Sequence, residues 1–194
     1  ENARASIAEQ IASIELPERY DMKWEGEKSA SNESMKYLFK YYPLAVILMI
    51  AILIALFKDY RKPAIIVLCL PLLFIGVIFG MMLSGKTFGF VAIVATLGLV
   101  GMLIKNGIVL MDEITLQINA GKEPVDALME SSASRFRPVM LASLTTILGM
   151  IPLLGDSLFG PAAVVIMGGL LVGTLITLLF IPVLYALFYR IRIK

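Results

Sequence analysis

Long apolar stretches separated by short polar segments fill the chain from about residue 40 onward. Five can be drawn, over residues 41–57, 63–83, 88–111, 138–154 and 159–188. A helix needs roughly 20 apolar residues to cross the hydrocarbon core of a bilayer. The stretches are too long for strands of a membrane barrel and lack their apolar/polar alternation. We therefore predict an all-α membrane protein with five transmembrane helices over residues 39–189.

Charged residues mark the two ends of the chain. Residues 1–40 hold fourteen of the thirty-two charged side chains, so we interpret residues 1–38 as the end of a domain outside the membrane and the lead-in to the first helix. Their start lacks the basic and then apolar pattern of a secretory signal, which suggests that the chain begins inside a longer protein. Residues 190–194 form a short basic tail.

The short loops predict the orientation of the helices, because Lys and Arg prefer the cytoplasmic side. Nine cations fall on one side: Lys58, Arg61, Lys62, Lys122, Arg135, Arg137, Arg190, Arg192 and Lys194. The opposite loops, at residues 84–87 and 155–158, contain a single cationic side chain, that of Lys86. We expect a cytoplasmic C-terminus, with the residues before the first helix on the other side of the membrane.

The segment between the third and fourth stretches predicts a separate helix near residues 123–133. Gly121 is a typical helix stop and Pro124 a typical first-turn residue. An apolar stripe follows, formed by Val125, Leu128 and Met129. We expect this helix to lie along the cytoplasmic face, either as a docking element for a partner or as a plain connector, since such stripes are common.

Composition excludes several classes of protein. The chain is 59% hydrophobic and 16% charged, with a net charge of +2, one cysteine and no histidine. This small charge gives no sign of nucleic-acid binding. Without histidine the sequence offers no Ser/His or Cys/His catalytic pair and no metal cluster. We expect a protein that is not an enzyme and has no metal site or cofactor.

Small residues recur within the apolar stretches at the spacing of helix-packing motifs. The pairs are Gly76 with Gly80, Gly98 with Gly101, and Gly169 with Gly173. Such spacing lets helix backbones approach closely inside a membrane. We interpret these six glycines as packing residues, which places the second, third and fifth helices inside a bundle.

One cation lies deep in the third stretch, where Lys105 is followed by Asn106. A charge at this depth costs on the order of 3 kcal/mol, so the ammonium needs a partner or must lose its proton. Four residues share its helical stripe: Gly98, Gly101, Ile108 and Asp112. Asp112 is two turns away, about 10 Å along the axis. The counter-ion is therefore missing from these 194 residues, the side chain is neutral, or its long stem reaches the headgroups.

Several motifs together resemble one family of transporters. They are TLGLVGMLIKNGIVLMDE (96–113), SRFRPVMLASLTTILGMIPL (134–153) and VIMGGLLVGTLITLLFIPVLYALF (165–188), with ELPERYDMKWEGE (15–27) and ALFKDYRKPAIIVLCLPL (55–72) upstream. In this order they resemble the last part of a resistance-nodulation-division (RND) exporter, most closely its hydrophobe/amphiphile efflux branch. The resemblance covers nearly the whole chain and corresponds to helices eight to twelve of a twelve-helix transmembrane domain.

The resemblance implies a drug/proton antiporter of the bacterial inner membrane that exports amphiphilic compounds, with protons as the coupling ion. It also implies a homotrimer that works with a periplasmic adaptor and an outer-membrane channel, and it makes residues 1–38 periplasmic. Lys105, within its KN motif with Asn106, matches the lysine that pairs with two carboxylates of helix four in the N-terminal half. Arg135 matches an arginine that borders the proton path. The family's threonine falls on Ala142, which shifts that hydroxyl to Ser143 or removes it.

Two other interpretations stay open. The chain could be an inactive fragment or a stand-alone accessory membrane protein. It could also belong to the metal-exporting RND branch, because thioethers suit Cu(I) and the chain has eleven methionines, among them Met81 and Met82. Methionine is, however, also a common packing residue in the lipid phase.

Overall fold

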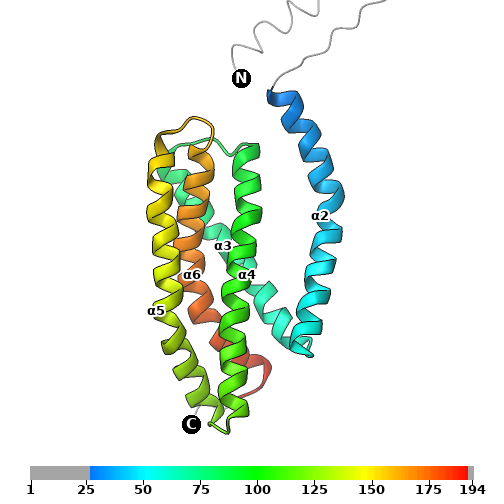
Figure 1. Cartoon of the computed structure of the whole chain (residues 1–194), viewed down its shortest axis with the longest axis vertical. Helices are drawn as coiled ribbons and strands as arrows, with labels where there is room; N and C mark the ends of the chain where they lie inside the picture. Colours follow the sequence, from blue (N-terminus) through cyan, green and yellow to red (C-terminus); the bar gives the residue numbers. More distant parts are fainter. Residues whose placement is uncertain (1–26, 192–194) are drawn as a thin grey trace, which may run out of the picture. The chain divides into compact units, whose positions relative to one another are not determined.

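The structure is a computed structural model that describes residues 27–191 of the chain. This range contains the helices α2 (Glu27–Phe57), α3 (Arg61–Ser84), α4 (Phe90–Asn119), α5 (Pro124–Met150), the 3-10 helix η1 (Ile151–Gly155) and α6 (Gly160–Phe188), and no strand (Figure 1). Five helices are long and apolar enough to cross a membrane. The prediction of an all-α fold with five candidate transmembrane helices is confirmed.

The chain divides into two compact units, residues 1–43 and 44–194. In the described part of the first unit, residues 27–43 form the beginning of α2, where Tyr37 and Phe39 are exposed. The lead-in predicted over residues 1–38 is thus helical from Glu27 onward, because the backbone of α2 continues through polar residues that hydropathy does not count. Residues 1–26 of that prediction, and Arg192 and Lys194 of the basic tail, lie outside the described residues.

Helix α6 is the centre of the second unit. It contacts α3, α4 and α5, and its contact with α3 is the most extensive. Twelve of its residues are buried, more than in any other described helix. One apolar cluster includes Ile66, Leu110 and Ile181, and a second includes Leu73 and Val165. α6 is apolar all round its circumference, as is typical of a membrane span, and several of its large apolar side chains are left exposed by the described helices.

The crossing of α3 and α6 depends on glycine. A Cβ atom on Gly76 would lie 2.5 Å from the carbonyl oxygen of Gly168, and one on Gly80 would lie 3.2 Å from the carbonyl oxygen of Val164. Only residues without a side chain allow two backbones to come this close. The sequence singled out Gly76 and Gly80 but not Gly168, their partner on α6.

Glycine also shapes the contact between α4 and α6. Leu99 and Leu103 of α4 are buried, and their side chains occupy the space above Gly169 and Gly173 of α6. A Cβ atom on Gly173 would lie 2.7 Å from Cδ1 of Leu103. Because these two glycines of α6 have no side chain, they leave space for the two leucine side chains of α4.

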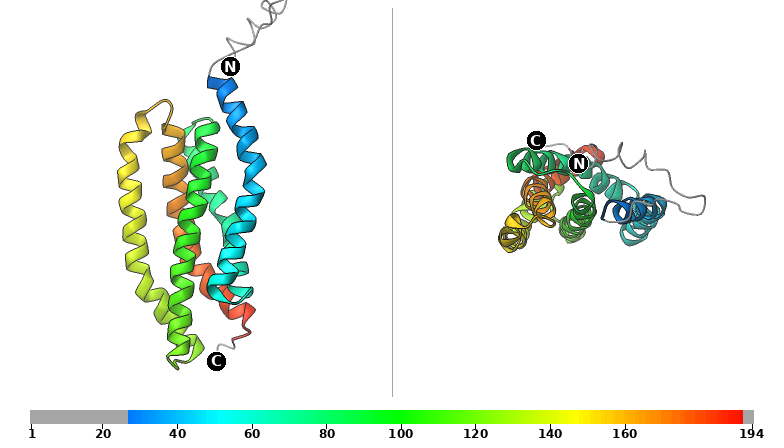
Figure 2. Two further views of the ribbon diagram at one scale, coloured as in Figure 1. Left: turned by 45° about the vertical axis from the view of Figure 1, so that its right-hand side comes forward. Right: turned by 90° about the horizontal axis from the view of Figure 1, so that it is seen from above.

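A separate connector helix at residues 123–133 is not present, because that segment is the beginning of α5. Gly121 ends the α4–α5 turn with φ +87°, and Pro124 opens α5 as expected. The polar first turns of α5 and its apolar remainder form one continuous helix. Pro138 lies inside the helix, and the first part of α5 is inclined to the rest (Figure 2). A proline bend of this kind does not interrupt a membrane helix, because neighbouring groups satisfy the freed carbonyls.

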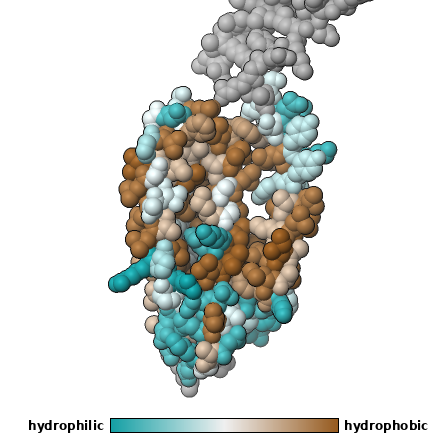
Figure 3. All heavy atoms as spheres, viewed as in Figure 1, coloured by the Kyte–Doolittle hydropathy of each residue, from teal (hydrophilic) through white to brown (hydrophobic). Residues whose placement is uncertain are grey.

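The loop between α2 and α3 meets the end of α6. Tyr189 donates a hydrogen bond from its hydroxyl to the carboxylate of Asp59, and the guanidinium of Arg61 lies 5.5 Å from the centre of the Tyr189 ring. Lys62 is buried and donates to Thr115 Oγ1 of α4 at 2.8 Å. We call this end of the second unit, with the turn around Lys122, the basic end; Figure 3 shows hydrophilic side chains gathered there.

Candidate functional site

Helix α4 has two faces of different character. Leu99, Leu103, Leu110 and Ile114 are buried on one side. At 100° per residue the stripe that carries Lys105 lies on the opposite side. Gly98, Gly101, Lys105 and Asp112 are all exposed there, and a Cβ atom on either glycine would meet nothing within 4 Å. In the described chain, the predicted packing surface at Gly98 and Gly101 is therefore uncovered.

Lys105 lies midway along this open stripe. Within residues 27–191 neither its ammonium nor the amide of Asn106 has a hydrogen bond or ion pair to another side chain. The structure therefore does not join Lys105 to Arg135 or Ser143. An ammonium on the exposed side of an apolar helix is costly in lipid unless it is paired, neutral or able to reach the headgroups.

Arg135 is held by α4 instead. Its Nη2 atom lies 2.5 Å from Oε2 of Glu113, and Gln117 donates from Nε2 to Oε1 of the same carboxylate at 3.0 Å. Glu113 and Gln117 are one turn apart on α4, so the carboxylate that binds Arg135 and the amide that supports it belong to the same helix. The sequence did not identify Glu113 as this partner, although the α4–α5 hairpin brings the two segments side by side.

Ser143 faces α6. Its hydroxyl lies 2.9 Å from Oγ1 of Thr174, and both residues are buried. Ala142, which takes the place of the family threonine, is exposed. The hydroxyl of Ser143, the residue after Ala142, therefore lies between α5 and α6. Lys105 lies on the exposed side of α4.

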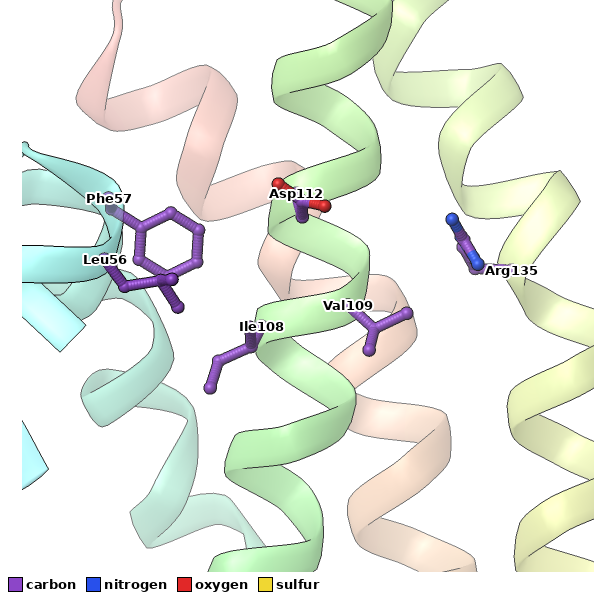
Figure 4. A pocket seen from close by; sticks show the side chains of 6 residues that line it. All are labelled: Leu56, Phe57, Ile108, Val109, Asp112 and Arg135. Carbon is purple, nitrogen blue, oxygen red and sulfur yellow. The ribbon is translucent and has the colours of Figure 1, made fainter. Parts of the chain in front are cut away.

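An open cavity of about 370 Å³ lies at the basic end of the Lys105 stripe. Its lining comes from three helices: Leu56 and Phe57 of α2, Ile108, Val109 and Asp112 of α4, and Arg135 of α5 (Figure 4). Asp112 and Arg135 are its only charged lining residues. Because Ile108 and Asp112 share the stripe of Lys105, the cavity begins one turn from that lysine.

Neither a metal cluster nor an exposed thiol is found among the residues that the structure describes. In the part of the chain that the structure describes, no three of the residues His, Cys, Asp and Glu gather as a metal site would require. Cys69, the single cysteine, is buried among apolar side chains.

Comparison with known proteins identifies the family. Residues 1–189 match the model of the AcrB/AcrD/AcrF family. Multidrug resistance protein MdtC of Serratia proteamaculans (strain 568) is 29% identical over 199 residues, which cover all of this chain and 19% of that protein. The chain thus spans about a fifth of the length of this relative.

Two crystal forms of a heavy metal efflux pump have the same fold. Form II superposes with a TM-score of 0.74 at 26% identity and covers 97% of this chain and 20% of that one. Form I gives a TM-score of 0.70 at 24% identity, over 98% and 19% of the two chains. The motifs, the five apolar helices and the family match agree, and the chain belongs to the AcrB/AcrD/AcrF family of RND efflux transporters, which are multi-pass membrane proteins.

Proposed function

We propose that this chain provides transmembrane helices eight to twelve of a proton-driven RND pump that exports amphiphilic compounds, with Lys105 in its proton relay. The observation that carries the proposal is the position of Lys105. Its ammonium lies on the open face of an apolar helix, and the described residues provide no acidic partner for it. A cation retained at such a place is a functional residue by default.

The relay works by a change of partner charge. Carboxylates on helix four of the N-terminal half hold Lys105 while they are ionised, and protonation of one of them weakens that attraction. The two protonation states favour different packings of the halves, so the proton gradient drives the exchange between them. The uncovered backbone at Gly98 and Gly101 gives the opposing helix room to shift. Asn106 and Arg135 belong to the relay as neighbours of these charges.

The rest of the assembly follows from the family. We propose a homotrimer in the bacterial inner membrane that works with a periplasmic adaptor and an outer-membrane channel. The basic end would face the cytoplasm, in agreement with the preference of Lys and Arg for that side. Residues 1–38 would then lead in from the periplasm.

Amphiphile export is favoured by the name of the relative MdtC, a multidrug resistance protein. The second candidate is metal export, because the superposed structures are those of a heavy metal efflux pump. Met82 is exposed at the end of α3 away from the basic end, where a thioether could meet Cu(I). Growth of cells that carry the complete transporter, challenged separately with cationic dyes and with copper or zinc salts, distinguishes the two substrates.

The direct test is Lys105→Ala in the complete transporter, with Lys105→Arg as a variant that keeps the charge. We expect Lys105→Ala to abolish dye efflux while the protein is made and assembles normally, because the carboxylates lose the charge to which they respond. Wild-type efflux by Lys105→Ala would remove the lysine from the mechanism. The matched control is Lys86→Ala, which removes a cation from the loop at the other end of the bundle.

A further inference from the structure

We propose that the cavity beside Ile108 is the aqueous route between the basic end and Lys105, and that Asp112 is the carboxyl group that passes protons through it. This inference rests on the proton coupling proposed above and adds a route and a residue to it. It starts from the position of the cavity, whose lining includes two residues of the Lys105 stripe, Ile108 and Asp112.

The spacing on α4 requires water between the two charged groups. Lys105 and Asp112 are seven residues apart, about 10 Å along the helix axis, so Asp112 cannot pass a proton directly to the carboxylates that hold Lys105. The volume of about 370 Å³ accommodates a chain of several water molecules. Since the cavity begins at Ile108, such a chain ends one turn from the ammonium.

The charges around the cavity suit a carboxylate that gains and loses a proton. One Asp112 oxygen accepts a proton from a hydrated proton in the cavity, which leaves neutral water behind. It later releases that proton to a second water, which passes it on toward the helix-four carboxylates, so only O–H bonds form and break. Arg135 faces the cavity from α5 and balances the carboxylate while the proton is away. On α4 itself Lys105 and Glu113 are the neighbouring charges, and α2 contributes only the apolar Leu56 and Phe57.

Glu113 gives Arg135 a fixed place at the wall of the cavity. The carboxylate binds the guanidinium and is itself held by Gln117. Glu113 is thus a positioning residue that acts through Arg135, whereas Asp112 touches the transferred proton.

The first experiment measures access of water to the cavity in the full transporter. Ile108→Cys is introduced with Cys69→Ala, in a background without other reactive cysteines, and inverted membrane vesicles are treated with a charged, membrane-impermeant methanethiosulfonate. The matched control is Val183→Cys, which is 64% exposed on α6. It lies at a similar depth, because Gly107 of α4 contacts Ile181 of α6. We expect Ile108→Cys to react at least about tenfold faster. Equal rates would overturn the aqueous route.

The second experiment measures the proton step in proteoliposomes that contain the full transporter and an imposed pH gradient. We expect Asp112→Asn to reduce export roughly tenfold or more and to flatten its pH profile, and Asp112→Glu to restore both. Asp126→Asn, an exposed carboxylate near the start of α5, should change neither. A wild-type rate and pH profile for Asp112→Asn would overturn the role of Asp112.

The outcome also separates this inference from the proposed function. If Lys105→Ala is inactive and Asp112→Asn is normal, the proton coupling stands and the route through Asp112 is wrong. If both variants export normally, both proposals are wrong. Glu113→Gln adds a test of positioning, because it should shift the pH profile of export, and Glu113→Asp should bring it back.

Discussion

Ser143 of α5 and Thr174 of α6 share a buried hydrogen bond of 2.9 Å between their hydroxyl oxygens. Among the residues that the structure describes, it is the one side-chain hydrogen bond between α5 and α6. It uses the hydroxyl that the resemblance offered in place of the family's threonine. Its position between α5 and α6 separates it from the face of α4 that carries Lys105.

We first predict that Ser143→Ala lowers the stability of the complete transporter by about 1 kcal/mol, because Thr174 loses its partner. The double variant Ser143→Ala with Thr174→Val should cost less than the sum of the single changes, since it leaves no hydroxyl unpaired. Thermal unfolding in detergent measures both. If Ser143→Ala instead shifts the pH profile of export with no loss of stability, Ser143 belongs to the relay after all.

The second prediction concerns the crossing of α3 and α6. A Cβ atom on Gly76 would lie 2.5 Å from a backbone oxygen of Gly168, which cannot move aside as a side chain could. Gly76→Ala should therefore destabilise the protein by about 1–3 kcal/mol. Gly149→Ala in α5, where a Cβ atom meets nothing within 4 Å, is the control. A melting temperature of Gly76→Ala equal to that of the control would contradict this close packing.

The ion pair of Glu113 and Arg135 leads to a third prediction. Both side chains are partly exposed, so solvent screening limits the contribution of the pair to about 1 kcal/mol or less. Glu113→Gln and Arg135→Gln should each destabilise the α4–α5 hairpin, and the exchanged pair Glu113→Arg with Arg135→Glu should recover part of the loss. A double-mutant cycle on unfolding free energies gives the coupling. Zero coupling would mean that the pair does not join the helices.

The fourth prediction is a pH dependence at the basic end. Partial burial raises the pKa of Asp59, but the hydrogen bonds from Tyr189 and the Arg61 backbone, with the nearby cations Lys62 and Arg61, lower it overall below its usual 3.8. The stability that this carboxylate contributes is therefore present above pH 3.8 and is lost as the pH falls through the lower folded value. Partial burial, followed by the same hydrogen bond to Asp59, raises the pKa of Tyr189.

Tyr189→Phe tests this dependence. We expect the variant to be less stable than wild type near neutral pH, by no more than about 1 kcal/mol, and the difference to vanish in strong acid. Unfolding measured from pH 7 down to about pH 1, below the usual carboxyl pKa, shows whether the two curves converge. Curves that stay parallel over the whole range would show that the Tyr189 hydroxyl stabilises the loop without the charge of Asp59.

The number of helices was predictable because each crossing requires a minimum apolar length. Their bounds were not, because a helix continues through polar residues once it has begun. Residues 27–38 belong to α2 and residues 124–137 belong to α5. These residues are largely polar, so a search for apolar stretches does not include them in the helices. Pro138 looked like the start of a helix for the same reason, although it lies within α5.

Lys105 was evident from the sequence because a charge stands out in an apolar run. The sequence did not show that Glu113, and not Asp112, binds Arg135. Adjacent helical residues point about 100° apart, and only the rotation of α4 about its axis decides which of the two carboxylates reaches Arg135. Rotation also decides that Gly168, rather than Gly169, meets Gly76. Periodicity identifies a candidate face of a helix but does not identify the helix that covers it.

The central place of α6 has a consequence for biosynthesis. α3 contacts α6 far more extensively than it contacts α4, yet α6 leaves the ribosome after both. Within this chain α3, α4 and α5 each contact α6 more extensively than they contact one another, so they lack their main packing partner until residue 160 and those beyond it enter the bilayer. A nonsense mutation in the α5–α6 connection would therefore remove that shared partner from all three helices at once.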